Sequence, residues 1–284
     1  DLHSFPTRRS SDLPTVFPVE FFIGLILIGV AAGFASGLLG VGGGFLMVPL
    51  QYYLLQHIGV ENNLAMLISL ATSLAIIIPT TLTGAYRHTR KMDNILHNGI
   101  RLGLFGVFGG LFGGFVASSL PSRSLEIIFG ILLLFVCINN IYSINKEIQK
   151  PKISFNLLST AIIGLVVGFL SGLLGIGGGV FLIAILTIFF GFPMIESIGT
   201  SSIFISLTAV GGLVSYIISG WGVNTFPFSV GYVSLINLIV ICMFSVPVAN
   251  FSAKLAHKMP EKKLKIIFSI LVVYISFKML GIFS

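Results

Sequence analysis

The sequence predicts an all-α integral membrane protein made of two inverted four-segment repeats, each a glycine-broken hairpin followed by three transmembrane helices. Three observations lead to this fold class: the composition, the spacing of apolar segments and an internal duplication. Of the 284 residues, 55% are hydrophobic and only 9% are charged, and the mean hydropathy is +1.05. Soluble globular domains carry about 25% charged residues, and a chain of this length has too little interior for so much apolar surface. The lipid bilayer must therefore be its solvent.

The same composition excludes a disordered tail protein, a nucleic-acid-binding module and a secreted disulfide scaffold. The two cysteines, Cys137 and Cys242, lie inside long apolar runs, so neither indicates a disulfide bridge or a metal site. The formal net charge is +7. In a membrane protein the positions of Lys and Arg report orientation first, so this charge does not by itself indicate an anionic partner.

The N-terminal stretch 1–13, DLHSFPTRRSSDL, contains no apolar run and changes abruptly into hydrophobic sequence. We interpret it as a non-native leader that resembles a translated sequencing-adapter fragment, and we exclude it from the fold. A short extramembrane tail is the alternative, and neither interpretation gives it a function. A cleaved signal peptide does not fit, because the apolar run after Glu20 exceeds the core length of about 7 to 15 residues.

Polar residues divide the rest of the chain into eight apolar segments, at 21–55, 64–86, 99–120, 125–144, 157–193, 197–219, 228–250 and 264–283. Six of them have the length of a single membrane span, about 20 residues. At about 1.5 Å per residue this length matches a hydrocarbon core about 30 Å thick, so we expect spanning helices. The first and fifth segments are too long for one span and too short for two spans and a turn.

These two long segments share a glycine motif. Residues 33–44 read GFASGLLGVGGG and residues 168–179 read GFLSGLLGIGGG. Ala71-Thr72-Ser73 in the second segment likewise corresponds to Gly199-Thr200-Ser201 in the sixth. The chain is therefore an internal duplication. Its expected parts are a first membrane repeat, a cytoplasmic linker and a second membrane repeat, at residues 14–144, 145–155 and 156–284.

Charge indicates how the repeats are oriented. Arg87, Arg90 and Lys91 follow the second segment, whereas the equivalent loop at 219–228 has no Lys or Arg. If the two long segments crossed the membrane fully, the 14 Lys and Arg after the leader would divide 8 to 6. If each is a hairpin that returns to its own side, they divide 12 to 2. The positive-inside rule thus favours hairpins, termini outside and inverted halves.

The glycine motifs place two helix breaks near the middle of the membrane. Backbone groups at a break are tolerated there only if protein buries them or if they line a polar cavity. A helix N-terminus attracts anions, and glycine lets an anion approach the backbone closely. We expect a small-anion site formed by Gly42, Gly43, Gly44, Gly177, Gly178 and Gly179. The alternative is that these glycines only allow close helix packing, as expected for Gly109 and Gly110.

Hydroxyl side chains recur at equivalent positions early in two helices, at Thr72, Ser73, Thr200 and Ser201. They could donate hydrogen bonds to an oxyanion in the same cavity. The alternative is that they bond to carbonyl groups of their own helix or join neighbouring helices.

No Asp, Glu or His lies in the middle of an apolar segment. A relay of intramembrane carboxylates is therefore not visible, and a membrane enzyme has no base or metal ligands to use. We expect no catalytic residue, no metal and no cofactor. The run Gly40 to Phe45 lacks the Lys-Ser/Thr of a nucleotide-binding loop. Lys278, inside the last segment, lies close enough to the chain end to extend toward water.

The duplicated motifs resemble the TauE/SafE sulfite exporter family of bacterial and archaeal membrane proteins. The resemblance runs from about Val19 to the end of the chain. Its strongest stretches are residues 33–49, 71–84, 168–186 and 199–212. It implies a multi-pass protein of the prokaryotic inner membrane that moves small sulfur-containing anions such as sulfite, thiosulfate or sulfonates, mostly outward. It also implicates the same glycines and the same Thr and Ser residues.

Together these patterns predict a secondary transporter, and specifically an exporter, that carries small anions by alternating access. Its expected partners are the anion and the lipid bilayer, not nucleic acid, and a homodimer is left open. Export could use the membrane potential, worth about 2.3 kcal/mol per charge per 100 mV, or coupling to protons or sodium. A transporter of another small organic anion and a non-transporting membrane scaffold are the alternatives.

Overall fold

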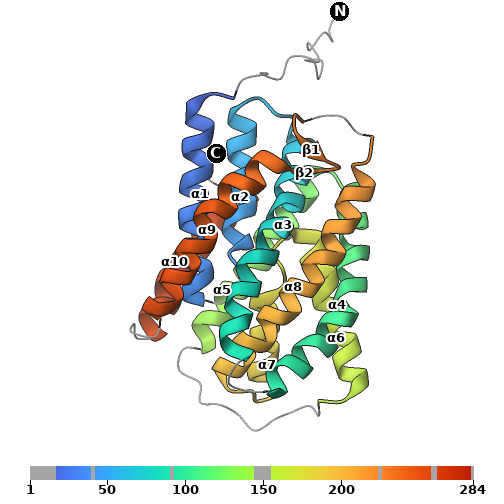
Figure 1. Ribbon diagram of the computed structural model, residues 1–284, viewed down its shortest axis with the longest axis vertical. Coiled ribbons are helices and arrows are strands. Elements are labelled where there is room, and N and C mark those ends of the chain that lie inside the picture. Colours follow the sequence, from blue (N-terminus) through green and yellow to red (C-terminus); the bar gives the residue numbers. More distant parts are fainter. Residues whose placement is uncertain are drawn as a thin grey trace, which may run out of the picture.

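The helices of this chain begin and end where its glycines, prolines and polar residues interrupt apolar sequence. The computed structural model describes residues 17–39, 42–89, 93–143, 155–222, 226–256 and 261–282. The leader at 1–13 and linker residues 145–154 lie outside this described part. What it does describe is an elongated bundle of α-helices with one small β-hairpin (Figure 1). The all-α membrane class predicted from the sequence is confirmed to that extent.

The first half contains α1 (Val19–Leu39), α2 (Gly44–His57), α3 (Asn62–Thr89), α4 (Asp93–Ser119) and α5 (Ser122–Ser143). The second half contains α6 (Leu157–Leu174), α7 (Gly179–Ile188), α8 (Met194–Ser219), β1 (Ser229–Val230), β2 (Val233–Ser234), α9 (Leu235–Ala256) and α10 (Glu261–Leu280). Within the described residues, six helices are long and apolar enough to cross a membrane: α1, α3, α4, α6, α8 and α9. The chain is thus a multi-pass membrane protein.

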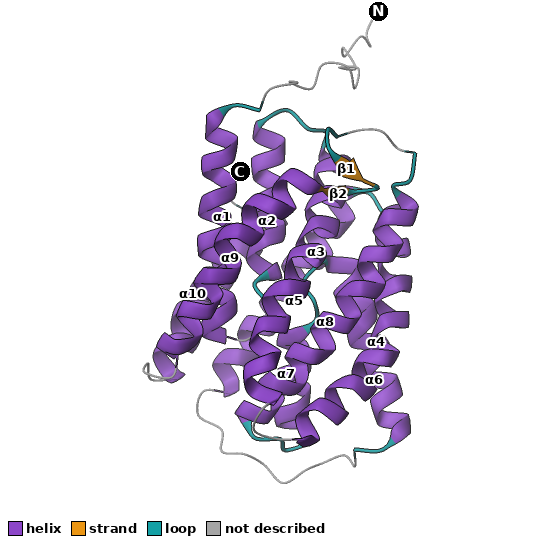
Figure 2. Cartoon of the chain, viewed as in Figure 1, coloured by secondary structure: helices purple, strands orange, loops and turns teal. Residues whose placement is uncertain are grey.

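Each half opens with a hairpin that is broken at the glycine motif. α2 and α7 are short, with 14 and 10 residues, and start inside the bundle, where Figure 2 shows loop segments in teal. The glycines that cap them, Gly43 and Gly178, have φ angles of +74° and +71°. Side chains disfavour this left-handed conformation, which explains why glycine occupies both positions.

The first helix of each half packs in parallel on the third apolar segment of the other half. Along α6, Gly164 lies against Leu102 of α4, and Gly168 lies against Gly106. A Cβ atom at Gly168 would come within 2.5 Å of the carbonyl oxygen of Gly106. Only glycine permits backbones to approach this closely, and such contacts replace the hydrophobic driving force that lipid does not supply.

The same contact recurs with the halves exchanged. Gly29 and Gly33 of α1 lie against Ile241 and Ser245 of α9, and a Cβ atom at Gly33 would come within 2.5 Å of the carbonyl oxygen of Ser245. Gly33 and Gly168 occupy the same place in the duplicated motif. The duplication is therefore visible in packing as well as in sequence.

The central helices α3 and α8 run antiparallel. Leu74 of α3 contacts Gly212 of α8, and further along α3 the hydroxyl groups of Thr81 and Ser206 lie 2.8 Å apart. α5 and α10 are also antiparallel, because Arg123 at the start of α5 bonds the carbonyl of Leu280 at the end of α10. In Figure 1, α10 and α1 lie along one side of the bundle and α4 and α6 along the other.

We name the two ends of the bundle by their aromatic residues. At the tyrosine end, Tyr52 and Tyr53 in the last turns of α2 adjoin the start of α5. At the phenylalanine end, the ring of Phe155 lies 5.3 Å from that of Phe190 and 5.4 Å from that of Phe192. α3 begins beside the end of α2, and α8 begins beside the end of α7. Because α3 and α8 are antiparallel, the tyrosine end and the phenylalanine end lie at opposite ends of the bundle.

Two predictions about the apolar segments differ from the structure. The six candidate spans among the described residues include α1 and α6, expected as arms of the broken hairpins, and do not include α5 and α10, which were expected to span. The apolar run 228–250 was expected to be helical throughout, but residues 229–234 form the β1–β2 hairpin, and α9 extends from 235 to 256. The turn contains Gly231 with a φ of +58°, and the amide of Leu235 donates to the carbonyl of Phe228. Apolar content could not distinguish a short hairpin from a helix there.

We expect Gly168→Ala to destabilise the protein by about 1–3 kcal/mol, because the new methyl group would overlap backbone atoms of α4. Gly24→Ala is the matched control, since the nearest atoms to its Cβ all belong to the flexible side chain of Leu54. Thermal unfolding of the purified variants in detergent measures the difference. Equal midpoints for the two variants would show that the α4–α6 contact does not depend on this glycine.

Candidate functional site

The two helix breaks meet in the middle of the bundle. A Cβ atom at Gly44, the first residue of α2, would lie 2.9 Å from the backbone of Ile176 in the other break. A Cβ at either Gly44 or Gly177 would also contact the side chain of Ile77 on α3. The glycines expected to form one site are thus brought together across the two halves, and all six are buried.

The helix starts at this meeting point create a positive electrostatic environment. α2 runs from it toward the tyrosine end and α7 toward the phenylalanine end, so the N-terminal ends of both helix dipoles face the same region. Gly43 and Gly178 cap these helices, and glycine has no side chain that could accept hydrogen bonds from first-turn N–H groups. Buried helix starts of this kind are suited to an anion.

Two serines beside the breaks were missed by the sequence analysis. The Cβ atom of Ser36 on α1 lies 3.3 Å from a Cβ built at Gly43, and that of Ser171 on α6 lies 3.2 Å from one built at Gly178. The hydroxyl of Ser171 is buried with no hydrogen-bond partner among the described residues. A signal was present, because both serines occupy the fourth position of the duplicated motif.

The predicted site serines, Ser73 and Ser201, donate to backbone carbonyl groups. The hydroxyl of Ser73 is 2.9 Å from the carbonyl oxygen of Leu70 and 2.6 Å from that of Gly175, which ties α3 to the end of α6. The hydroxyl of Ser201 donates to Ile198 of its own helix at 3.0 Å. Both protons are therefore engaged in helix contacts, which was the alternative role considered for them.

The two threonines differ from each other in hydrogen bonding. Thr72 accepts a 3.0 Å hydrogen bond from the backbone N–H of Ser234. Thr200 is completely buried, and its hydroxyl has no partner within the described part of the chain. Burying a hydroxyl without a partner raises the free energy of the folded protein. A ligand that accepts a hydrogen bond from this hydroxyl would therefore be stabilised there.

The threonines also lie on opposite sides of the breaks. Ile77 of α3 and Ile205 of α8 contact the breaks. On each helix the threonine, Thr72 or Thr200, lies five residues before this isoleucine, which is about 7 Å along the helix axis. Because α3 and α8 are antiparallel, Thr72 lies toward the tyrosine end and Thr200 toward the phenylalanine end. The structure therefore brings the predicted glycines together and places Ser73 beside one break, whereas Thr72 and Thr200 lie apart.

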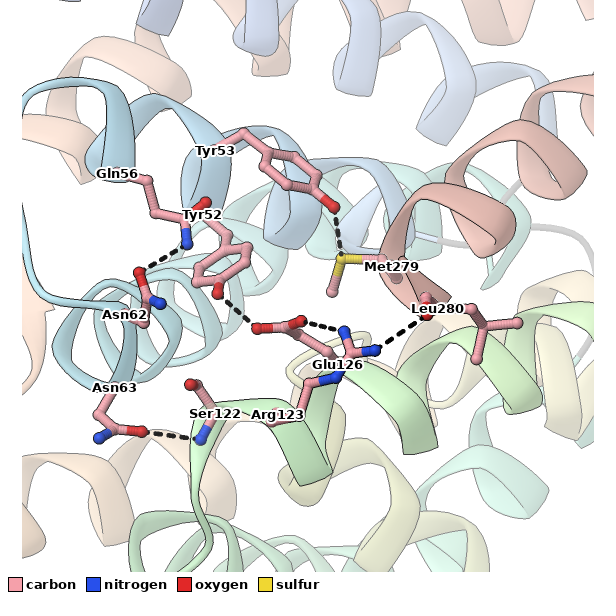
Figure 3. A network of polar contacts seen from close by, with 10 residues as sticks. All are labelled: Tyr52, Tyr53, Gln56, Asn62, Asn63, Ser122, Arg123, Glu126, Met279 and Leu280. Atoms are coloured by element: carbon pink, nitrogen blue, oxygen red, sulfur yellow. Dashed lines mark hydrogen bonds and ion pairs between the residues drawn. The ribbon is translucent and has the colours of Figure 1, made fainter. Parts of the chain in front are cut away.

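A separate cleft of about 480 Å³ opens at the tyrosine end. It is lined by Tyr52, Tyr53, Gln56, Asn62, Ser122, Arg123, Glu126, Lys278 and Gly281. Figure 3 shows the polar contacts at its wall: the hydroxyl of Tyr52 donates to Glu126 at 2.5 Å, and Arg123 donates to the other carboxylate oxygen at 3.0 Å. No sequence pattern indicated that these residues, from α2 and α5, would meet.

The same network attaches α10 to the first half. Arg123 donates to the carbonyl of Leu280 at 3.0 Å, and the ammonium of Lys278 lies 4.1 Å from the centre of the Tyr53 ring. The side chain of Arg123 is 58% exposed, so its ion pair with Glu126 contributes little by itself. The ion pair instead positions neighbouring helices, because the Glu126 carboxylate bonds a tyrosine of α2 and an arginine that also bonds α10. We call this set of contacts the Glu126 clasp.

The described residues contain no group of three or more His, Cys, Asp or Glu side chains placed to hold a metal ion. No charged side chain is among their fully buried residues either. The polar chemistry in the bundle interior therefore comes from hydroxyl groups, amides and the backbone.

Comparison with known proteins gives consistent matches. The family model described as "Sulfite exporter TauE/SafE" matches residues 25–279. A "Probable membrane transporter protein" of Haemophilus influenzae is 33% identical over 265 residues, covering 91% of this chain and 98% of the relative. A protein of the same description from Methanocaldococcus jannaschii is 29% identical, covering 86% and 90%, and YdhB of Bacillus subtilis is 31% identical, covering 85% and 93%. No solved structure matches the chain significantly.

We expect Glu126→Gln to lower the thermal midpoint, because an amide accepts more weakly than a carboxylate and cannot pair with Arg123. The loss should correspond to about 1.5–3 kcal/mol, the range for hydrogen bonds to charged groups. Glu61→Gln is the control, since Glu61 is exposed and its carboxylate accepts a 3.3 Å bond from the amide side chain of Asn63. Thermal unfolding in detergent checks both. A Glu126 variant as stable as the Glu61 variant would show that the clasp does not hold α2 and α10 together.

Proposed function

The chain belongs to the sulfite exporter TauE/SafE family, and on that premise we propose that it is a secondary transporter that exports small anions across the cell membrane. Sulfur-containing oxyanions and sulfonates are the expected cargo, in keeping with the family description. One observation carries the proposal: the buried, glycine-capped starts of α2 and α7 meet at the centre of a membrane bundle.

An anion at this position is stabilised by the partial positive charge of helix N-termini that are already fixed in the fold. Each helix N-terminus is equivalent to roughly +0.5 of an elementary charge, and both serve the same region. Glycine leaves room for the anion beside the backbone, and Ser171 has a buried hydroxyl that lacks a partner among the described residues. Such a site binds an anion without a buried Lys or Arg, whose own desolvation would cost several kcal/mol.

We infer that the halves are inverted repeats. α1 is parallel to α9, and α6 is parallel to α4; each pair joins the first hairpin helix of one half to the third apolar segment of the other. The equivalent helices α3 and α8 are antiparallel. This combination is expected if every element of the second half runs opposite to its counterpart. Inverted repeats with paired broken helices are typical of secondary transporters that alternate between two open states around a central site.

The close glycine contacts suggest which parts move together. α1 is held to α9 and α6 is held to α4, so each pair combines both halves of the sequence. We propose that these pairs move as rigid bodies and slide along the α3–α8 contact. Opening toward the tyrosine end would expose Thr72, and opening toward the phenylalanine end would expose Thr200.

The charge distribution supports an orientation with the tyrosine end outside an inner membrane. The end of α3 and the start of α10 lie at the phenylalanine end and carry Arg87, Lys262, Lys263 and Lys265. The tyrosine end has Arg123 and Lys278. By the positive-inside rule the phenylalanine end faces the cytoplasm.

We propose uniport driven by the membrane potential. Fully buried described residues include no Asp, Glu or His that would carry a proton. A cell interior that is negative by about 100 mV expels each anionic charge with about 2.3 kcal/mol. A homodimer stays a prediction.

We expect the purified protein to show a higher thermal midpoint with one class of small anion, in a panel of sulfite, thiosulfate, sulfonates, sulfate, carboxylates and chloride, because ligands of the folded state stabilise it. Thr200→Val should weaken that affinity by roughly tenfold, one hydrogen bond of about 1.4 kcal/mol, without lowering the midpoint of the unliganded protein. Ser201→Ala is the control, because the proton of Ser201 bonds its own helix.

A stable protein whose midpoint responds to no anion in the panel would contradict the proposed transport function. That result would favour the membrane scaffold, in which the glycines serve only packing. A response that is equal in Thr200→Val and the wild type would retain the anion site but remove Thr200 from it.

A further inference from the structure

A second group of buried polar residues lies between the helix breaks and the tyrosine end. Gln51 of α2, Thr72 of α3, Ser234 of β2 and Asn237 of α9 are all completely buried. They form one chain of hydrogen bonds: Ser234 N–H to Thr72 at 3.0 Å, Asn237 N–H to Ser234 at 3.3 Å, and the Asn237 amide to Gln51 at 3.3 Å.

The two amides leave half of their hydrogen-bonding groups unused. The Nε2 atom of Gln51 and the Oδ1 atom of Asn237 have no partner within the described part of the chain. Exchanging oxygen and nitrogen in both amides gives the same result, because one NH2 group and one carbonyl oxygen are again left over. Each unmet group costs about 1–3 kcal/mol when buried, so the pair destabilises the empty protein.

Packing does not require an amide at this place. Leu186 follows Gly179 at the same spacing as Gln51 follows Gly44, so it is the equivalent residue of the second hairpin, and it is just as completely buried. A leucine therefore fits the same position of a broken hairpin. The amide in the first hairpin is retained at a cost in stability, which is typical of polar groups that act in ligand pathways.

The unused groups define the chemistry of a ligand. Gln51 offers an N–H donor, and Asn237 offers a carbonyl acceptor. An anion with acceptor oxygens alone would satisfy only the donor. An anion that also bears a hydroxyl or amino group would satisfy both, and sites built to bond such a group discriminate strongly against analogues that lack it.

We propose that Gln51 and Asn237 form a second subsite of the transport pathway, which selects small anions that carry a hydroxyl or amino donor next to the anionic group. The proposal rests on the anion transport proposed above. Gln51 follows Gly44 by seven residues, about 10 Å along α2. The subsite is therefore separate from the central site and lies on its tyrosine-end side, next to Thr72.

The test compares anions that differ by one hydroxyl group. Thermal midpoints of the purified full chain are measured against concentration for 2-hydroxyethanesulfonate and ethanesulfonate, and for 2-hydroxypropionate and propionate. We expect the hydroxylated member of at least one pair to bind about tenfold more tightly, the effect of one added hydrogen bond in a buried site.

The double variant Gln51→Leu, Asn237→Leu should abolish this preference, so that the two members of each pair bind with equal affinity. Its unliganded midpoint should be equal to or higher than that of the wild type, because two half-satisfied amides become apolar together. Gln56→Leu is the matched control: it removes an amide from the same helix, but one that bonds Asn62 at the exposed end. The single variant Gln51→Leu serves if the double variant does not fold.

Each outcome has a distinct meaning. If no anion stabilises the wild type, the proposed transport function fails, and this inference fails with it. If anions stabilise the wild type but the members of each pair bind equally, or the preference survives in the Leu variants, the subsite is overturned while the central site stands. A lower unliganded midpoint in the Leu variants together with an intact preference for the hydroxylated anion would also overturn the subsite. That result would assign the amides a purely structural role.

Discussion

A helix break inside a membrane must have its backbone groups covered, and the rest of this structure follows from that constraint. Hydrocarbon offers no hydrogen bonds to the residues around Gly43 and Gly178, so protein must surround them. Each break is covered by the other break and by the central helices, which Ile77 shows by contacting both. The breaks are therefore covered where the two halves pack together, and the proposed site lies at their junction.

The same constraint explains why glycine recurs along the helices. To cover the breaks, α1 must lie against α9 and α6 against α4 with almost no separation, which Gly33 and Gly168 permit. Close backbone contact also makes these pairs rigid, whereas the α3–α8 contact is joined by side chains such as Thr81 and Ser206. Rigid pairs on either side of a softer contact are the mechanical requirement for a bundle that opens at one end at a time.

Sequence reasoning located the breaks because the motif occurs twice, and coincidence does not reproduce a pattern of this length. It missed the hairpin at 229–234, since a short apolar run has no periodicity that separates a buried strand from a helix. It placed Thr72 and Thr200 together because helix depth and direction cannot be read from spacing alone. The partner of Gln51 is 186 residues away on α9, and no local pattern indicates such a contact.

The duplication also shows where the two sides of the proposed pathway differ. A symmetric transporter would present equivalent groups toward both membrane faces, yet Gln51 corresponds to Leu186, and Thr72 has a backbone partner where Thr200 has none among the described residues. The tyrosine-end side thus has two amides in a connected network. The phenylalanine-end side has hydroxyl groups instead, and those of Ser197 and Thr200 have no partner within the described part of the chain. The two sides of the breaks therefore differ in the kind of polar group that they offer. That difference arises from a few substitutions on a repeated framework.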